Sequence, residues 1–474
     1  MLNEMKSQIP AGKTVALLVI TVLFSAPLFG ITLDQSIKLA EENNKTFLSQ
    51  KAGLKQAEWN QYNSLTNFFP KISIGTMIVR LDDDMYERYT GPITIPVYDI
   101  NDPTNQIGFI PFSSAAMTPG GMHKTTYTTQ LTLQQPIFNG GKILLGYQIA
   151  RLATSQTQAT LQSAKNNLEY SVTEIYLNIL RIQDVIEISR RSLASSEAQL
   201  KKVTEMYNVG TARKSDVLQW QVQVENNKIA LNVVENSLSV LLSSWRNILG
   251  LQEEEETPLP EPIALNQYDS EIESYAVLSK EEQETLLQNV LAETEKNNAD
   301  IKALRLAENI TKKSYQLAKT DFLPTFNLQY TYQFENDDKL NFDDAAGMEY
   351  WNITAIASLP IFQSGKNYTN LRRSKYEYKK TQLELADTRD QILIGAENSF
   401  YTLVTNAKNV SSNSLALESA QENYKIINDL YEQGMVTNTE LIDAEIMLFN
   451  GEMGLTSAYY DYILAKCNLE KFIK

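Results

Sequence analysis

Apolar residues recur in alternating steps of four and three along the segment from Lys142 to Tyr207. No proline interrupts this segment, and Gly146 is its only glycine. This spacing predicts coiled-coil packing of one helix on the order of 100 Å long. The apolar positions are Leu168, Val172, Ile175, Ile179, Ile182, Ile186, Leu193, Leu200, Val203 and Tyr207. A looser series follows 224 residues later at Ala396, Leu403, Val410, Leu417, Tyr424 and Tyr431.

Other segments change to a period of two, which is typical of strands. In 325–335, Phe326, Leu328 and Tyr330 alternate with uncharged polar residues. Strands of about ten residues with aromatic side chains near their ends are typical of an outer-membrane barrel, although a soluble sandwich with one wet face has the same pattern. Four strands cannot close a barrel, whereas three chains together would supply twelve and leave a lumen. The predicted strands cover about 71–81, 125–135, 325–335 and 351–359.

Several landmarks occur twice, which indicates a tandem duplication. Pro-Ile-Phe-x-x-Gly-Lys begins at Pro136 and again at Pro360, 224 residues later. Landmarks upstream of the first motif, such as Pro70 and Pro324, are 254 apart instead. The difference of 30 residues predicts an insertion in the first copy, in the connection 82–124 between its two strands, which we expect to be an extracellular loop. It is rich in Pro, Gly and aromatic residues, so it could cover the pore, bind neighbours or simply be long.

The two copies are predicted to span 31–250 and 283–474, with an acidic linker at 251–282 that packs round the middle of a helical tunnel. Each copy should contain a rising helix, two strands, a long descending helix, a tight hairpin and a returning helix. Thr437 and Glu440 form a capping-box sequence at the second hairpin. The predicted helices are about 32–67, 141–208, 214–250, 283–321, 365–432 and 438–472.

Residues 1–30 have the features of a secretory signal: Lys6 and Lys13 precede an apolar core at 15–24 and a zone of small residues. The net charge of −15 disfavours nucleic acid as a partner. With one cysteine, Cys467, and one histidine, His123, the chain lacks the residues for disulfides, thiolate metal clusters or histidine-based catalysis. The sequence therefore predicts an exported protein that is not an enzyme and needs no cofactor or metal.

The sequence resembles the TolC family of outer membrane efflux proteins over essentially the whole mature chain. The resemblance rests on "ITLDQSIKLAEENN", both "PIF…GK" junctions and the hairpins "YNVGTARKSDVL" and "YEQGMVTNTELIDA". It implies a mixed α+β membrane protein: a homotrimer with a 12-stranded β-barrel in outer-membrane lipid and a coiled-coil tunnel in the periplasm. It also implies docking with a periplasmic adaptor and an inner-membrane pump of the RND or ABC type.

The same resemblance implies that tyrosine and acidic residues at the hairpins gate the periplasmic entrance. The second hairpin carries Val436 where the best-known members have an arginine, and Arg213 lies in the first hairpin instead. We therefore expect Arg213 to pair with Asp443 or Glu440 and hold the closed state. The implied gate residues are Tyr431, Glu440, Asp443, Ser215, Asp216 and Arg213. The implied adaptor-docking residues are Tyr207, Gly210, Gly434 and Thr437.

The main functional hypothesis is therefore a passive exit duct for a tripartite efflux or type I secretion system. The alternative is an exported coiled-coil scaffold or adaptor without a pore. The sequence leaves the cargo open between drugs, metal ions and proteins, because a generic duct carries whatever its pump supplies.

Overall fold

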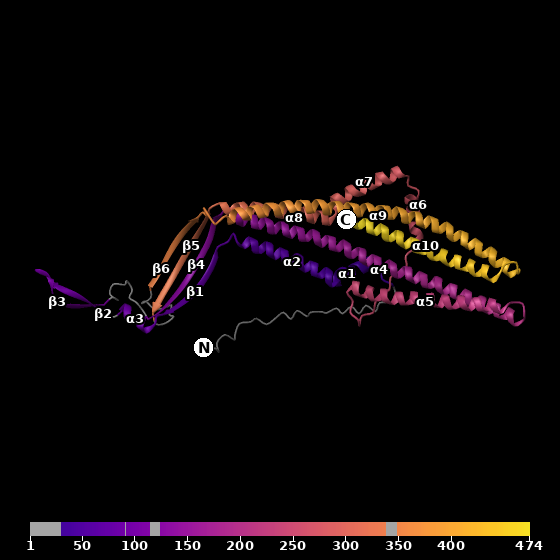
Figure 1. The fold of residues 1–474 in the computed structure, drawn as a ribbon, viewed down its shortest axis with the longest axis horizontal. Coiled ribbons are helices and arrows are strands. Elements are labelled where there is room, and N and C mark those ends of the chain that lie inside the picture. Colours follow the sequence, from indigo (N-terminus) through magenta and orange to yellow (C-terminus); the bar gives the residue numbers. More distant parts are fainter. Residues whose placement is uncertain (1–29, 91, 114–123, 338–347) are drawn as a thin grey trace, which may run out of the picture.

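The computed structural model describes residues 30–90, 92–113, 124–337 and 348–474. The molecule is elongated, with long helices at one end and a four-stranded sheet at the other (Figure 1). Residues 1–29 of the predicted signal sequence lie outside the described residues, as does His123. None of the helices in the described residues combines the length and apolar character that a membrane-spanning helix needs.

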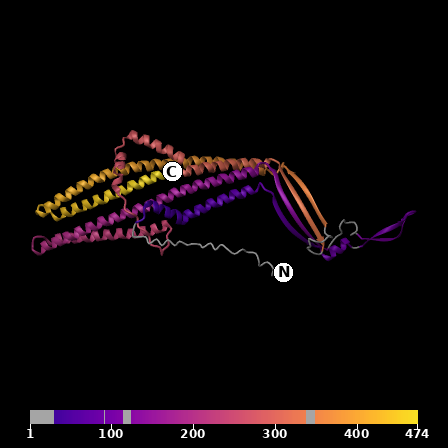
Figure 2. The ribbon, with the colours of Figure 1, turned by 180° about the vertical axis from the view of Figure 1, so that it is seen from behind.

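Four long helices form the body of the molecule and run beside one another in both views (Figures 1 and 2). They are α4 (Lys142–Asn208), α5 (Lys214–Leu249), α9 (Lys366–Glu432) and α10 (Asn438–Ile473). The helices α4 and α9 each have 67 residues, and α5 and α10 each have 36. Predicted seam residues of α4 such as Val172 and Ile179 are fully buried, so the heptad pattern marks the packed face.

The shorter helices correct one sequence expectation. Continuous helices were expected at 32–67 and 283–321, but each is broken at an asparagine. The first becomes α1 (Leu33–Asn43) and α2 (Lys45–Thr66), and the second becomes α7 (Lys280–Asn297), α8 (Ala299–Lys319) and a 3-10 turn, η3 (Thr320–Phe322). Asn44 and Asn298 have extended ψ angles of 116° and 126°, and their side chains cap the helix that follows. An asparagine side chain competes with the helical backbone in this way, so it starts a new helix instead of continuing the old one.

The main sheet is antiparallel, with the order β1-β4-β5-β6. Its strands are β1 (Lys71–Arg80), β4 (Thr125–Asn139), β5 (Thr325–Asp337) and β6 (Met348–Ser358). The strand predicted at about 125–135 continues past Pro136, because β4 pairs with β5 as far as Asn139. A register irregularity between Pro136 and Phe138 accommodates the proline, which has no N–H for the ladder.

The connection 82–124 is not the simple loop that the sequence suggested. It contains a helix, α3 (Asp83–Thr90), and a separate hairpin of β2 (Pro92–Asp99) and β3 (Asp102–Ser113). This hairpin projects from the sheet on the side away from the long helices (Figure 1). Alternation at Ile93 and Ile95 signals β2, but the prolines in both strands obscured the pattern.

The linker 251–282 crosses the middle of the helical body. It forms a 3-10 turn, η2 (Leu265–Tyr268), and α6 (Asp269–Ala276), and α7 already begins inside its last residues. Polar bonds hold α6 against α10: Lys466 Nζ lies 2.6 Å from Glu271, and the Tyr459 hydroxyl lies 2.7 Å from Asp269. The main core lies at this level, where the buried rings of Tyr176 and Trp245 meet edge to face.

Candidate functional site: the helical tip

The first hairpin turns at a glycine with a left-handed backbone. Beyond the end of α4, Gly210 has φ +83°, and the Thr211 N–H donates to the Met206 carbonyl at 2.9 Å. Only glycine adopts this conformation without strain. The carboxylate of Asp216 then accepts a hydrogen bond from the Arg213 N–H at 3.0 Å, which fixes the start of α5. The sequence "YNVGTARKSD" therefore builds a turn only a few residues long.

The second hairpin repeats this geometry with a stronger cap. Gly434 has φ +72°, and the Met435 N–H donates to the Leu430 carbonyl at 2.9 Å. Glu440 accepts bonds from the Thr437 N–H at 2.6 Å and from its hydroxyl at 2.8 Å. These bonds to the Thr437 backbone and side chain lower the pKa of Glu440, so the carboxylate stays ionised. The capping box predicted from the sequence is present in full.

The structure brings some of the predicted gate residues together. Tyr431 is half-buried between the two hairpins, and burial raises the pKa of its phenol, with a smaller contribution from the nearby charge of Asp216. The Ser215 hydroxyl lies 3.4 Å from the same aspartate. Asp443 is exposed on the first turns of α10. Tyr431 packs against an apolar cluster to which both hairpins contribute, including Val217 and Leu441, and Asp443 faces solvent in the single chain.

Arg213 makes no ion pair with Asp443 or Glu440 among the described residues of the single chain. Its backbone takes part in the start of α5, while its side chain is exposed. The basic contact at this level joins Lys202 on α4 to Glu432 on α9, with 3.2 Å between Nζ and the carboxylate. The pairing expected for Arg213 is thus not an intrachain contact in this structure.

A buried polar contact at the tip was missed by the sequence interpretation. Trp220 on α5 has no exposed surface, and its indole N–H donates to the side-chain oxygen of Asn438 at the start of α10. The Asn438 amide donates in turn to Gln219 at 2.8 Å, and the Tyr431 hydroxyl lies 3.4 Å from the Asn438 oxygen. The spacing of Val217, Trp220 and Val224 predicts the burial of the tryptophan, but not its partner in the other hairpin.

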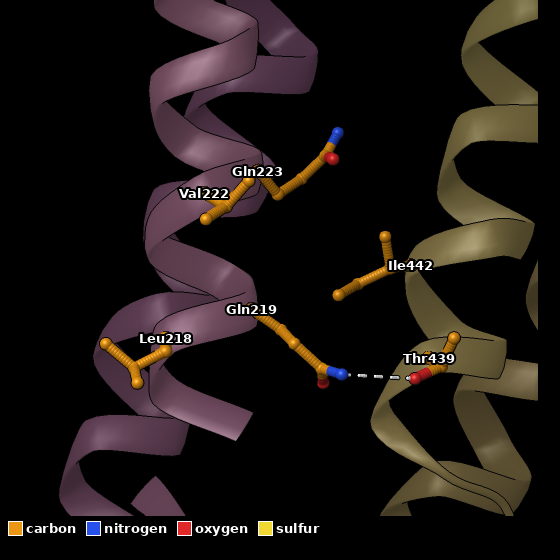
Figure 3. Close-up of a pocket in the computed structure, with 6 residues that line it drawn as sticks. All are labelled: Leu218, Gln219, Val222, Gln223, Thr439 and Ile442. Carbon is orange, nitrogen blue, oxygen red and sulfur yellow. Dashed lines mark hydrogen bonds between the residues drawn. The ribbon is translucent and has the colours of Figure 1, made fainter. Parts of the chain in front are cut away.

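The two returning helices leave a shallow groove beside this contact. It has a volume of about 390 Å³ and is shown in Figure 3. The Gln219 side chain reaches across it to the Thr439 hydroxyl at 3.4 Å. Apolar side chains make up most of the remaining wall. The lining residues are Leu218, Gln219, Val222, Gln223, Thr439 and Ile442.

One carboxyl group near the tip is buried. Glu445 on α10 is 6% exposed, and neither of its carboxylate oxygens has a hydrogen-bond partner among the described residues. Burial raises the pKa of Glu445, and the nearby Ser195 hydroxyl on α4 opposes this shift only in part. Tyr424 on α9 is the titratable group that faces it. Among the described residues, no three His, Cys, Asp or Glu side chains gather as metal ligands would.

The sequence was compared with protein families and with known proteins. The outer membrane efflux protein family matches residues 36–251 and 290–473. The chain is 23% identical to outer membrane protein TolC of Escherichia coli (strain K12) over 372 residues, which are 76% of this chain and 71% of TolC. It is 22% identical over 354 residues to the alkaline protease secretion protein AprF of Pseudomonas aeruginosa, covering 73% of this chain and 69% of AprF.

Solved structures agree on the fold. CusC superposes with a TM-score of 0.74 at 14% identity, covering 94% of this chain and 93% of CusC. The CmeC outer membrane channel of Campylobacter jejuni superposes with a TM-score of 0.71 at 16% identity, covering 93% of this chain and 85% of CmeC. Since the family match extends through both halves and includes both hairpins, the chain belongs to the outer membrane efflux protein family.

Proposed function

We propose that this protein is the trimeric outer-membrane exit duct of a tripartite efflux or type I secretion system. The observation that carries the proposal is a four-stranded sheet with two unpaired edges, joined directly to two 67-residue helices. Membership of the family favours this function over an exported scaffold without a pore.

The unpaired edges of the sheet support the proposal that three copies assemble into one barrel. Among the described residues, β1 pairs only with β4, and β6 pairs only with β5. Unpaired backbone groups are costly in a bilayer, since no water is present to satisfy them. Pairing β6 of one copy with β1 of the next would remove every open edge, and three copies give twelve strands around a lumen. The matched lengths of α4 with α9 and of α5 with α10 agree with the proposed tandem repeat.

The tip then becomes the entrance of the duct. Threefold symmetry would bring three copies of Asp443 and three of Glu440 around one axis. Rings of carboxylates favour cations. Glu440 is already engaged by Thr437, whereas Asp443 is exposed and available to face its symmetry mates or Arg213 of a neighbouring copy. We assign Asp443 the larger part in selectivity, and we assign Tyr431, which packs against the apolar cluster shared by the two hairpins, the link between them.

The groove in Figure 3 gives the proposed adaptor a place to dock. It opens beside the turns that contain Tyr207, Gly210, Gly434 and Thr437, and it exposes the apolar side chains of Leu218 and Val222. An inner-membrane pump of the RND or ABC type would supply energy and select the cargo. AprF is named for alkaline protease secretion and BepC of Brucella suis for efflux, so both secretion and efflux are named among the relatives.

Planar-bilayer conductance of the detergent-purified protein tests the proposal. The wild type is compared with Asp443→Asn, Glu440→Gln and, as a charge-matched control, Glu254→Gln in the linker. We expect small cation-selective currents, with selectivity lost in Asp443→Asn, partly retained in Glu440→Gln and unchanged in the control.

If Asp443→Asn forms pores with unchanged selectivity, the result would support the proposed duct but contradict the role of Asp443 in its gate. A folded protein that stays monomeric and soluble without detergent would contradict the proposal as a whole. Light scattering of the same preparation measures the oligomeric state independently of the currents.

A further inference from the structure

The inserted hairpin β2–β3 has one continuous apolar face. Residues that pair across an antiparallel ribbon project to the same side. The register pairs Ile93 with Phe112, Ile95 with Ile110 and Val97 with Gly108. Apart from Gly108, which has no side chain, this face of the ribbon is made of aliphatic and aromatic side chains. The opposite face is mixed, because Thr94 pairs there with Pro111 and Pro96 pairs with Phe109.

None of the described residues of the chain covers this apolar face. Ile95 is 46% exposed and Ile110 is 57% exposed, although both alternate as buried strand residues do. A single two-stranded hairpin is at most marginally stable in water, because it has nothing to pack against. The ribbon therefore needs a partner for this face.

The base of the hairpin is held in place at the end of the main sheet. The Leu81 N–H donates to the Lys124 carbonyl at 2.8 Å, and the Lys124 ammonium pairs with Asp83 at the start of α3. The insertion thus leaves the sheet from β1, which is an edge strand. In the proposed barrel that edge is the seam with the neighbouring copy, so each hairpin rises next to another protomer.

The charge pattern argues against lipid headgroups as the partner. Between residues 93 and 112 the charged residues are Asp99 and Asp102, both beside the turn, and the segment contains no lysine or arginine. Anionic headgroups are recognised by basic side chains. The ribbon also projects beyond the sheet, away from the strands that would lie in the bilayer (Figure 1).

The length of the hairpin is sufficient for it to contact the hairpin of another copy. Eight residues of β2 extend roughly 26 Å at the usual rise of a strand. A barrel of twelve strands tilted by about 40° has a backbone diameter of roughly 24 Å. Hairpins that start at three points on the rim can therefore meet one another above the opening.

We infer that the apolar faces of the β2–β3 hairpins pack against one another within the trimer, so that three copies form a small cluster over the extracellular mouth. This inference rests on the trimeric duct proposed above. Threefold symmetry brings the same residue of each copy to one axis, so equivalent positions on the three apolar faces can contact one another there. No basic residue lies in the contact, and the aspartates remain at the solvated turns.

Disulfide trapping tests the contact. Because Cys467 is the single cysteine, a Cys467→Ser background makes each introduced thiol unique. Ile95→Cys places a thiol on the apolar face, and Thr94→Cys places one on the opposite face of the same strand. After oxidation, non-reducing gels of the purified trimer should show covalent dimers for Ile95→Cys and none above background for Thr94→Cys.

Size analysis before denaturation separates the two proposals. Trimers that yield no dimers from either variant, or equal amounts from both, would overturn the hairpin contact and leave the duct intact. Dimers formed between separate trimers, detected by mixing two differently tagged preparations, would also overturn it. A chain that forms no trimer would remove the duct proposal and this inference together. A second variant, Ile95→Thr with Ile110→Thr, should lower the heat resistance of the trimer compared with Thr94→Ser.

Discussion

The side-chain amide of Asn298 donates a hydrogen bond to the backbone carbonyl oxygen of Phe472, 3.0 Å away. Asn44 makes the corresponding bond to the carbonyl of Ile248, also at 3.0 Å. The two asparagines are 254 residues apart and the two carbonyls 224, the same two offsets that relate the sequence landmarks. Each asparagine also accepts N–H bonds from the helix it starts. One side chain therefore joins the start of a rising helix to the end of a returning one.

We predict that Asn298→Ala lowers the free energy of unfolding by about 2 kcal/mol, roughly half from the lost cap and half from the lost bond to Phe472. Asn298→Ser should recover the cap but not the bond, because its hydroxyl is too short to reach the carbonyl. Thermal unfolding of the detergent-solubilised protein measures both. Asn309→Ala, at an exposed position inside α8, is the control and should change little. Equal effects of the alanine and serine variants would show that the bond to Phe472 contributes nothing.

Two glycines with nearly the same backbone angle make a matched test of close packing. Gly250 has φ +71° and Gly434 has φ +72°. A Cβ at Gly250 would collide with the Asn43 carbonyl oxygen, whereas one at Gly434 would meet nothing within 4 Å. Gly434→Ala should therefore cost only the left-handed strain, about 1–2 kcal/mol. Gly250→Ala should cost clearly more, because the end of α1 must move. Similar losses of melting temperature in the two variants would contradict this.

Breaking the contact between Trp220 and Asn438 should loosen the tip. Asn438→Ala leaves the buried indole N–H without an acceptor, at a cost of about 1–3 kcal/mol. We expect larger single-channel currents, because the two hairpins lose their shared polar contact, and a lower melting temperature. Gln221→Ala changes an exposed residue next to Trp220 on α5; it is the control and should conduct as the wild type does.

A double variant separates a latch from simple packing. Trp220→Phe with Asn438→Leu replaces donor and acceptor by apolar groups, so stability should largely return. Currents that stay high in this folded double variant would assign the gating effect to the hydrogen bond. If Asn438→Ala melts earlier but conducts normally, the contact is structural only.

Most of the fold could be predicted from local patterns in the sequence. The heptads predicted long helices because the positions of a heptad lie within a few residues of one another in the sequence. The strands were predicted from the alternation of apolar and polar residues at positions such as Phe326 and Leu328. The breaks at Asn44 and Asn298 were missed, since the asparagines are stabilised by carbonyls 204 and 174 residues away along the chain. The β2–β3 hairpin was missed because Pro96 and Pro103 are unusual in strands.

The site was only partly predictable for the same reason. Glycines and the Thr437–Glu440 cap place the turns, because turn chemistry is local. The partner of Trp220 lies in the other half of the chain, so no local spacing identifies it. Glu445 had no sequence signal either, since a carboxylate on a helix is normally solvated, and its burial depends on how α4 and α9 pack around it.

Glu445 and Glu440 lie on the same helix, but their pKa values shift in opposite directions. For Glu445 the folded-state pKa is raised by burial, so the folded protein binds the proton more tightly than the unfolded chain does. Its contribution to stability is fully present below the unfolded pKa of about 4.3 and is lost as the pH rises through the folded value. For Glu440, bonds to Thr437 lower the folded pKa, so its contribution is present above the unfolded pKa and is lost as the pH falls.

We therefore predict opposite effects of two isosteric substitutions. Glu445→Gln should raise the melting temperature most at neutral pH, where the wild type must keep a buried carboxylate charged or protonate it, and should flatten the dependence on pH. Glu440→Gln should lower the melting temperature at neutral pH and make little difference under acid conditions. Melting temperatures measured for both variants and the wild type between acid and neutral pH check the signs. If Glu445→Gln is destabilising at neutral pH, the carboxylate has a charged partner in the assembled trimer that the single chain does not provide.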